Sequence, residues 1–155
     1  MIALDVGHAQ LHERLRGDDR VTVLEKVNAR ELTELPYAPE LVVCDVSFIS
    51  VRIALPPALR LAAAGWQAVV LVKPQFEAGR GDVPKGVVRE PAVRARVLRE
   101  VADAALGWGA GVAGVVDSGL PGPKGNREFV LHLVHAESPR LPDDFDERIA
   151  AAVGA

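Results

Sequence analysis

Two short apolar runs, each ending on a charged residue, constrain the fold of this chain more than any other feature of its sequence. Residues 41–44 are apolar and lead into Asp45, and residues 68–72 are apolar and lead into Lys73. An apolar run of four or five residues without polar alternation is typical of a strand buried on both faces, as in parallel sheets. The two runs therefore predict neighbouring parallel strands.

Asp45 and Lys73 are the first candidate functional residues, because each directly follows one of these strands. Ligands and chemistry gather just beyond the carboxyl ends of the strands in open parallel sheets. We therefore expect the two residues at one rim, as a pair of opposite charges. Taken singly, Asp45 is explained as a helix cap and Lys73 as a solvated strand end. Their joint occurrence favours a functional site.

Strands alternate with helices along the whole chain, which predicts an α/β fold with a doubly wound, mostly parallel sheet. The expected strands cover residues 2–5, 21–25, 41–44, 68–72, 112–116 and 127–135. The expected helices cover residues 9–16, 51–64, 91–106 and 143–153. Pro56 and Pro57 do not fit within one straight helix, so a kink is expected there. The loop between the last two strands is too short to carry a crossover helix, so these strands should pair antiparallel.

Two further acids, Glu128 and Asp5, are expected at the same rim. An antiparallel last strand starts where the parallel strands end, and this brings Glu128 toward Asp45 and Lys73. Asp5 ends the first expected strand, and an acid at such a position commonly binds two ribose hydroxyls. Each acid alone is explained as a solvated rim charge.

The composition is that of an ordinary globular domain, with 155 residues, 49% of them hydrophobic and 25% charged. No apolar run approaches the length of a membrane span, and the first residues lack the features of a signal peptide, so a cytoplasmic location is expected. The net charge of −3 shows no basic surplus of the kind that grips nucleic acid. A polyanionic partner must therefore meet a local basic patch.

The candidate patch for RNA consists of Arg80, Lys85 and Arg89, in and after a segment rich in glycine and proline. The following helix carries three further arginines: Arg94, Arg96 and Arg99. A solvated helix face explains those three about as well as a phosphate-binding surface does.

Two other kinds of residue are better explained without a functional role. His8 and His12 have the spacing of metal ligands on a helix, but no third ligand is evident nearby, so no metal is expected. Cys44 lies inside an apolar run and is expected to be a small buried residue rather than a reactive thiol.

Four motifs closely resemble those of one known family: CDVSFIS (44–50), VKPQFEAG (72–79), KGVVR (85–89) and LPGPKGNREF (120–129). The opening IALDVG (2–7) resembles the second strand of the same family. This is the TlyA family of hemolysin A-like proteins, which is related to the FtsJ-like methyltransferases and shares their Rossmann-like fold. The resemblance spans residues 1–135 as a partial methyltransferase domain. Residues 136–155 are expected to form a polar, loosely held tail with a short helix.

The resemblance implies S-adenosylmethionine-dependent methylation of a ribose 2′-hydroxyl in cytidines of ribosomal RNA. Asp45, Lys73 and Glu128 match the last three members of the family's Lys-Asp-Lys-Glu catalytic set. Lys73 would stabilise the developing alkoxide, and the two carboxylates would hold this lysine and orient the hydroxyl. Asp5 matches the acid that binds the cofactor ribose, Asn28 lies where the family contacts adenine, and Asp45 is expected to contact the cofactor as well.

The sequence departs from the family pattern in its first part. The family begins with an RNA-binding S4-like domain, then a strand and a glycine-rich turn that cradles the methionine end of the cofactor. This sequence shows neither of these, and it lacks the first catalytic lysine. We therefore expect an N-terminally truncated catalytic domain. The missing glycine-rich turn leaves undecided whether this chain binds S-adenosylmethionine. We also expect exposed strand edges that close onto each other or pair with another chain, including a second copy.

Three functions are compatible with this pattern. The first is ribose methylation of ribosomal RNA or of a ribosomal subunit, although the missing cradle leaves open whether this chain alone is an enzyme. The second is a non-enzymatic remnant that binds RNA or protein through the surface from Arg80 to Arg99. The third is the membrane-acting hemolysin of the family's older name, which no amphipathic basic helix or apolar hairpin supports. A membrane partner is not expected.

Overall fold

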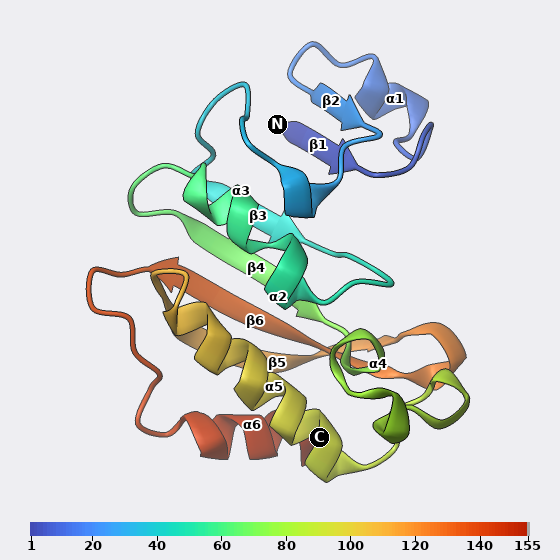
Figure 1. The fold of residues 1–155 in the computed structure, drawn as a ribbon, viewed down its shortest axis with the longest axis vertical. Helices are drawn as coiled ribbons and strands as arrows, with labels where there is room; N and C mark the ends of the chain where they lie inside the picture. Colours follow the sequence, from blue (N-terminus) through green and yellow to red (C-terminus); the bar gives the residue numbers. More distant parts are fainter. Residues whose placement is uncertain (155) are drawn as a thin grey trace.

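A computed structural model describes residues 1–154, which form an α/β fold with two separate sheets (Figure 1). The smaller sheet has two parallel strands, β1 (Ile2–Asp5) and β2 (Thr22–Glu25). The larger sheet has the order β3-β4-β6-β5. Its strands are β3 (Leu41–Cys44), β4 (Gln67–Val72), β5 (Ala110–Pro121) and β6 (Arg127–His135).

The larger sheet is mixed. Strands β3 and β4 are parallel, whereas β6 runs antiparallel to both of its neighbours, β4 and β5. The predicted antiparallel pairing of the last two strands is confirmed. Strand β5 is longer than the expected 112–116, because its irregular pairing continues as far as Pro121 opposite Arg127. The expected α/β class is confirmed.

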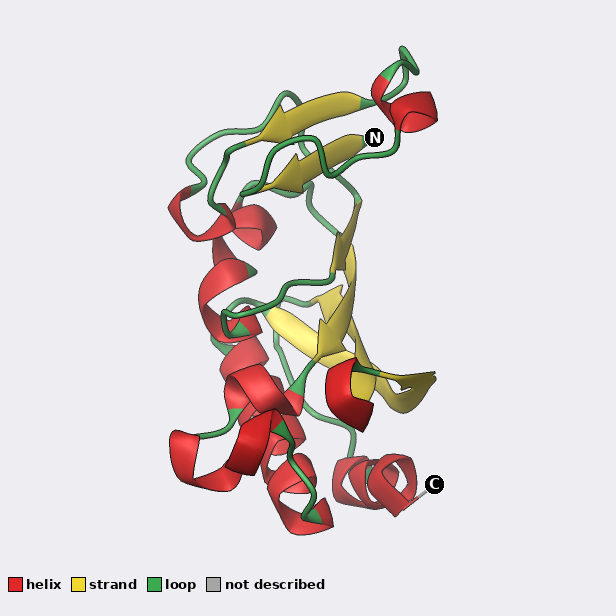
Figure 2. Cartoon of the chain, turned by 90° about the vertical axis from the view of Figure 1, so that its right-hand side faces the viewer, coloured by secondary structure: helices red, strands yellow, loops and turns green. Residues whose placement is uncertain are grey.

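The helices lie mainly on one side of the larger sheet (Figure 2). The α-helices are α1 (Glu13–Arg16), α2 (Val51–Ala54), α3 (Pro56–Arg60), α4 (Pro74–Glu77), α5 (Pro91–Leu106) and α6 (Phe145–Gly154). Four short 3₁₀ turns complete the described elements: η1 (Ala29–Glu31), η2 (Arg80–Asp82), η3 (Pro84–Gly86) and η4 (Pro123–Gly125).

Proline and backbone conformation determine where two of the helices begin or end. The expected kink is confirmed, because α2 ends at Ala54 and α3 begins with Pro56 at its first position. Proline fits that first position since the missing N–H has no partner there in any case. The expected helix over residues 9–16 is reduced to α1, because Ala9 has a φ of 56°, which no right-handed helix contains.

The hydrophobic core lies between the larger sheet and α5, and α6 packs against both α5 and β5. Phe129 and Leu131 of β6 and Val97 of α5 are fully buried within it. Helix α6 contributes Phe145 and Ile149, which are also buried. The expectation of a loosely held tail is therefore wrong for α6, whose apolar side is part of the core.

The two sheets are separate, and no described strand joins them. Strands β1 and β3 belong to different sheets and do not pair with each other within residues 1–154. Val43 of β3 is consequently 72% exposed. A cavity of about 400 Å³ lies between the sheets and is lined mainly by apolar side chains. Turn η1 connects the two parts, because it packs against α2 and α3.

Candidate active site

Asp45 and Lys73 form an ion pair at the carboxyl ends of β3 and β4. Because these strands are parallel and adjacent, the residues that follow them emerge at the same rim. Lys73 Nζ lies 2.6 Å from Asp45 Oδ1 and donates a hydrogen bond to Ser47 Oγ at 3.0 Å. The side chain of Lys73 is 11% exposed and that of Asp45 is 64% exposed. The Lys73 amine is thus the buried member of the ion pair, and the Asp45 carboxylate is the solvent-exposed member.

Glu128 lies opposite Lys73 on the neighbouring antiparallel strand. Val72 of β4 pairs with Phe129 of β6, so Lys73 and Glu128 occupy the next position at the same end of the two strands. Both residues are buried. Among the contacts of residues 1–154, however, Glu128 is not within ion-pair distance of Lys73. Its Oε1 instead accepts a hydrogen bond from Gln75 Nε2 at 2.8 Å.

The carboxylate of Glu128 is confined by its surroundings. A Cβ built on Gly122 would lie 2.6 Å from Glu128 Cδ, so only glycine leaves room for this side chain. Gln75 Oε1 is buried and has no hydrogen-bond partner in the part of the chain that the structure describes. A buried polar atom without a partner is unfavourable. The Gln75 amide therefore offers an acceptor to any hydroxyl or amine bound beside Glu128.

The loop that carries Asp45 and Ser47 is fastened at its far end by Glu77 of α4. The carboxylate of Glu77 is almost fully buried, and it accepts hydrogen bonds from Ser50 Oγ at 2.5 Å and from the Val51 N–H at 2.7 Å. Arg52 Nε lies 3.3 Å from the same carboxylate. Lys73 and Glu77 stand at the two ends of one short helix, so α4 holds both ends of this loop.

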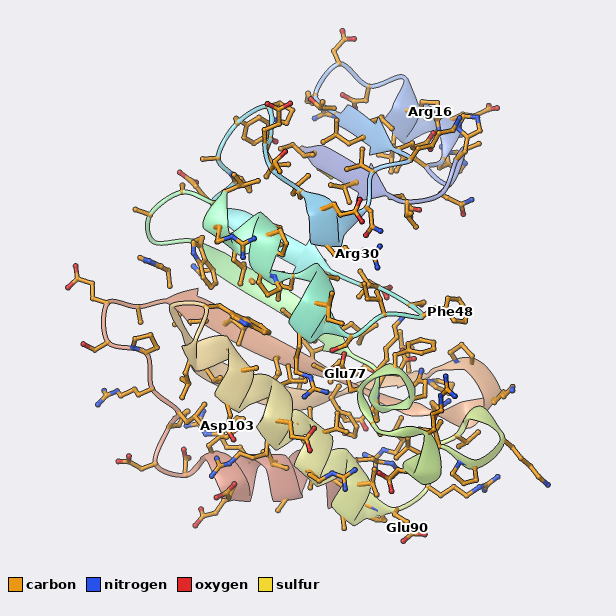
Figure 3. The ribbon with its side chains drawn as sticks, viewed as in Figure 1. Arg16, Arg30, Phe48, Glu77, Glu90 and Asp103 are labelled. Atoms are coloured by element: carbon orange, nitrogen blue, oxygen red, sulfur yellow. The ribbon has the colours of Figure 1, made fainter. Side chains whose placement is uncertain are left out.

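Phe48 projects from the same loop into solvent, as Figure 3 shows. It is 91% exposed and its backbone has a φ of 65°. The Phe48 ring contacts only one aromatic neighbour in the described chain, Phe76, with the ring centroids 5.1 Å apart. A large aromatic side chain held out by a left-handed backbone is exceptional, because both features cost free energy.

Asp5 and Asn28, the predicted cofactor residues of the first part of the chain, lie at the end of β1 and at the start of η1. Asp5 ends β1, and its Oδ1 accepts a hydrogen bond from the Gly7 N–H at 2.6 Å. Asn28 caps η1 by accepting a hydrogen bond from the Arg30 N–H at 3.3 Å. The cavity between the sheets is bordered by Leu4 and Ala29, their immediate neighbours in sequence, and by Asp45 itself. Of the three predicted cofactor residues, Asp45 alone lines this cavity, whereas Asp5 and Asn28 are next to residues that do.

This cavity fits one end of S-adenosylmethionine better than the other. Its apolar walls suit an adenine ring, and the Asp45 carboxylate in its lining suits ribose hydroxyls. The cofactor's methionine end carries a carboxylate, which requires a cation or several backbone N–H groups. None of the residues that line the cavity is a lysine or an arginine.

The basic residues separate into two groups according to their partners. Arg96 and Arg99 of α5 are paired with carboxylates on and around that helix. Arg94 donates to the Val88 carbonyl, and burial lowers its pKa. By contrast, Arg80, Lys85 and Arg89 are exposed and form no ion pair within residues 1–154. A fourth exposed basic residue with the same property, Lys124, lies beside Lys85.

The residues expected to lack a functional role have partners of their own. His8 Nδ1 lies 3.1 Å from Glu25, and His12 caps its own helix. Within residues 1–154 no cluster of three His, Cys, Asp or Glu side chains is arranged to hold a metal ion. Burial raises the pKa of Cys44 to about 11, so its thiol is unreactive at neutral pH. No helix of residues 1–154 is both long enough and apolar enough to cross a membrane.

Sequence reasoning did not single out Ser47, Gln75 or Lys124. Ser47 and Gln75 lie two residues after Asp45 and Lys73, so their proximity to the rim was implied by the strand ends. Their partners depend on loop conformation, which no periodic pattern encodes. Lys124 belongs to a Pro-Lys-Gly triplet that also occurs at residues 84–86. That repeated triplet was a signal within the sequence.

Comparison with known proteins identifies the family. The model of the FtsJ-like methyltransferase family matches residues 1–135. The chain is 49% identical over 138 residues to the 16S/23S rRNA (cytidine-2′-O)-methyltransferase TlyA of Mycobacterium tuberculosis, covering 86% of this chain and 51% of that protein. It is 37% identical over 136 residues to Hemolysin A of Brachyspira hyodysenteriae, covering 85% of this chain and 57% of the other.

A solved structure from Streptococcus thermophilus that carries the name hemolysin has the same fold. It superposes with a TM-score of 0.89 at 40% identity and covers 97% of this chain and 57% of that one. The chain thus spans about half the length of the curated relatives it matches. The resemblance to TlyA and hemolysin A-like proteins is confirmed over most of the chain. The chain belongs to the FtsJ-like methyltransferase family.

Proposed function

We propose that this chain is the catalytic part of an enzyme that transfers a methyl group from S-adenosylmethionine to the 2′-hydroxyl of a cytidine ribose in ribosomal RNA. The observation that carries the proposal is the rim at which Lys73 is held by Asp45 and Ser47, with Glu128 beside it. The names of the relatives supply the reaction and the RNA class. The geometry of the rim supplies residues with suitable chemistry.

Lys73 can donate to a bound hydroxyl. An ammonium group carries three N–H donors; within residues 1–154 Ser47 accepts one of them, and the Asp45 carboxylate lies at ion-pair distance. A remaining N–H can therefore be donated to the oxygen of a ribose hydroxyl. As the hydroxyl proton passes to the Asp45 carboxylate, the buried ammonium stabilises the negative charge that develops on the oxygen, and it does so without reorganising because it is already held in place.

The two carboxylates orient the hydroxyl. Asp45 is exposed beside the amine, so it can accept the hydroxyl hydrogen bond at the solvent side of the rim. Glu128 is buried on the other side and fixed by Gln75. A hydroxyl held between a donor and an acceptor has few orientations available, and this restriction lowers the activation barrier.

S-adenosylmethionine would supply the electrophilic methyl group when bound. Asp45, which lines the cavity between the sheets, would hold its adenosine end together with Asp5 and Asn28, which are next to the lining residues Leu4 and Ala29. The RNA would be bound through Arg80, Lys85 and Arg89, whose charges have no carboxylate partner within residues 1–154. The exposed ring of Phe48 offers a face on which an unpaired base can stack.

The test is a methylation assay with radiolabelled S-adenosylmethionine and unmethylated ribosomal RNA, followed by digestion to nucleosides. We expect 2′-O-methylcytidine as the product. Lys73→Ala should reduce the rate by at least about a hundredfold, as the loss of one oxyanion donor does elsewhere. Lys26→Ala is the matched control, because Lys26 is an exposed lysine of the smaller sheet and is not part of the rim.

Two results would contradict the proposal. Retained methylation by Lys73→Ala would remove this lysine from the reaction. If the unmodified chain neither binds S-adenosylmethionine in calorimetry nor methylates RNA, the second candidate function, RNA binding without catalysis, is favoured. The absence of a lysine or arginine among the cavity-lining residues is the observation on which this alternative rests.

A further inference from the structure

Two copies of one turn lie side by side next to the candidate active site. Each consists of Pro-Lys-Gly and forms a 3₁₀ turn, η3 with Lys85 and η4 with Lys124. The two lysines have nearly the same left-handed backbone, with φ and ψ of 57° and 21° in Lys85 and 59° and 18° in Lys124. We refer to the two turns together as the lysine clasp.

The hydrogen bonds of the two turns also correspond. In η3 the Gly86 N–H donates to the Val83 carbonyl at 3.1 Å, and in η4 the Gly125 N–H donates to the Gly122 carbonyl at 3.0 Å. In each turn the next N–H then donates to the proline carbonyl. A left-handed backbone at a lysine is unfavourable, and it persists only where the surrounding structure enforces it. Here the same unfavourable conformation is enforced twice.

Asn126 fastens the two turns together. This side chain is 2% exposed. Its Nδ2 donates to the carbonyls of Gly86 and Pro123, both at 2.9 Å, and its Oδ1 accepts from the Val88 N–H at 3.0 Å. One buried amide therefore contacts both turns and fixes the distance between them. The clasp is rigid although both of its lysines are exposed.

The lysines of the clasp lie close to each other without a neutralising carboxylate. Lys124 Nζ donates to the Lys85 backbone carbonyl at 3.2 Å. A Cβ on Gly86 would lie 3.1 Å from the same nitrogen, so a larger residue there would crowd the Lys124 side chain. Within residues 1–154 neither lysine forms an ion pair. The two turns bring two exposed lysines to one surface, and an anion bound there is attracted by both charges.

The clasp adjoins the rim that would bind the ribose. Gly122 directly precedes the Pro-Lys-Gly of η4, and it lies against the Glu128 carboxylate. Glu128 itself follows Asn126 by two residues. A ribose 2′-hydroxyl lies within one nucleotide of two backbone phosphates. A polyanionic strand whose sugar reaches Lys73 therefore passes close to the clasp.

We propose that the lysine clasp binds the phosphate backbone of a single RNA strand next to the nucleotide at the rim. This inference rests on the proposed function, because it takes the RNA strand as the ligand. Lys85 and Lys124 neutralise phosphate charge, and Asn126 is a positioning residue that holds the two lysines at a fixed separation. The clasp contacts phosphate rather than bases, so it positions the strand without reading its sequence.

The test measures how RNA binding depends on salt. Fluorescence anisotropy follows the binding of a labelled twelve-nucleotide single strand to the full chain between 20 and 200 mM salt. Each phosphate contact that is lost reduces the slope of log K against log salt by about 0.7 for a single strand. We expect this reduction for Lys85→Gln and for Lys124→Gln, and about 1.4 for the double variant. Lys124→Arg should retain the slope of the unmodified chain.

Lys26→Gln is the matched control, because Lys26 is also an exposed lysine with a left-handed backbone, at a φ of 58°, but lies on the smaller sheet. Its slope should remain that of the unmodified chain. Thermal unfolding of each variant establishes that the fold is retained. A purely structural role of Lys124, through its bond to the Lys85 carbonyl, would lower the melting temperature and leave the salt slope unchanged.

The clasp is refuted if neither glutamine variant changes the slope, if Lys26→Gln changes it equally, or if the unmodified chain does not bind RNA at the lowest salt. Methylation measured on the same samples separates this inference from the proposed function. A clasp-dependent slope without methylation would leave the clasp standing and refute catalysis by this chain. Methylation with salt slopes that the lysine variants leave unchanged would support catalysis by this chain and refute the clasp. A changed KM for S-adenosylmethionine with an unchanged RNA slope would assign the lysines to the cofactor and overturn the inference.

Discussion

Replacing Glu77 should unfasten the loop that carries half of the candidate site. The Glu77 carboxylate is almost fully buried and accepts hydrogen bonds from Ser50 and from the Val51 N–H, with Arg52 as its ionic partner. Glu77→Ala leaves the buried Val51 N–H without its acceptor and removes the buried carboxylate partner of Arg52, which keeps its contact with Glu100. Breaking a buried ion pair by removing one member typically costs ~3–5 kcal/mol. Glu77→Gln keeps one acceptor oxygen and should cost less, about 1–3 kcal/mol.

Urea unfolding followed by circular dichroism measures these differences as shifts of the midpoint at constant slope. A loss of ~3–5 kcal/mol should lower the melting temperature by roughly 10 °C in a domain of this size. Glu100→Ala is the matched control, because Glu100 is the exposed partner of the same Arg52, at 3.5 Å. Exposed pairs contribute about 0–1 kcal/mol. If Glu77→Ala is no more destabilised than Glu100→Ala, the buried carboxylate does not fasten this loop and the reasoning fails.

Two further predictions concern the rim and the smaller sheet. Gly122→Ala must displace the Glu128 carboxylate, so methylation should fall on the order of a hundredfold. Gly114→Ala is the control and should retain activity, because a Cβ at Gly114 has open space around it. Equal activity of the two variants would show that the Glu128 position is unimportant. The hydrogen bond from Arg16 lowers the pKa of Glu25 from 4.5 to about 2, so its stabilisation is complete above pH 4.5 and is lost as the pH falls toward 2. As the pH falls through this range, the melting temperature should decline less in Arg16→Gln than in the unmodified chain. Equal declines in the two proteins would contradict the role of Arg16.

Apolar runs and prolines carried most of the fold information in the sequence. The runs before Asp45 and Lys73 became adjacent parallel strands, and the kink at Pro56 appeared where two prolines interrupt a helical pattern. These features are local, so they are visible without the tertiary structure. Exposed edges on the first and third expected strands were predicted, because the sequence shows no counterpart of the family's strand between them. Within residues 1–154 the two strands stay unpaired, so the alternative in which they close onto each other is wrong.

Helix α6 shows how a tertiary contact can be underestimated from the sequence. Its segment contains several polar residues, which led to the expectation of a loosely held tail. Phe145, Ile149 and Val153 nevertheless recur every four residues and form one buried side. Arg127 of β6 donates hydrogen bonds to the carbonyls of Ala152 and Val153 at the end of the helix. The apolar period was present in the sequence, but the arginine that anchors the helix lies far away in the chain.

The candidate site was predictable where it depends on strand ends and not where it depends on side-chain partners. Asp45 and Lys73 were placed together by the rule for parallel strands, and they form an ion pair. Glu128 was expected to hold Lys73, but it is bonded to Gln75 instead, because the turn at Gly122 confines its carboxylate. The choice between a helix face and an RNA surface likewise required the ion pairs, which no sequence pattern gives.

The position of the smaller sheet has a consequence for ligand affinity. Within residues 1–154 it shares no strand pairing with the larger sheet and contacts it chiefly through η1. Segments joined by few contacts open at a small fraction of the global unfolding free energy. A molecule that must touch Asp5 on one side and Asp45 on the other binds only the closed population. If about one chain in ten is closed, the apparent dissociation constant is about tenfold weaker than the intrinsic one. Anything that held the two sheets together would then tighten binding without touching the ligand.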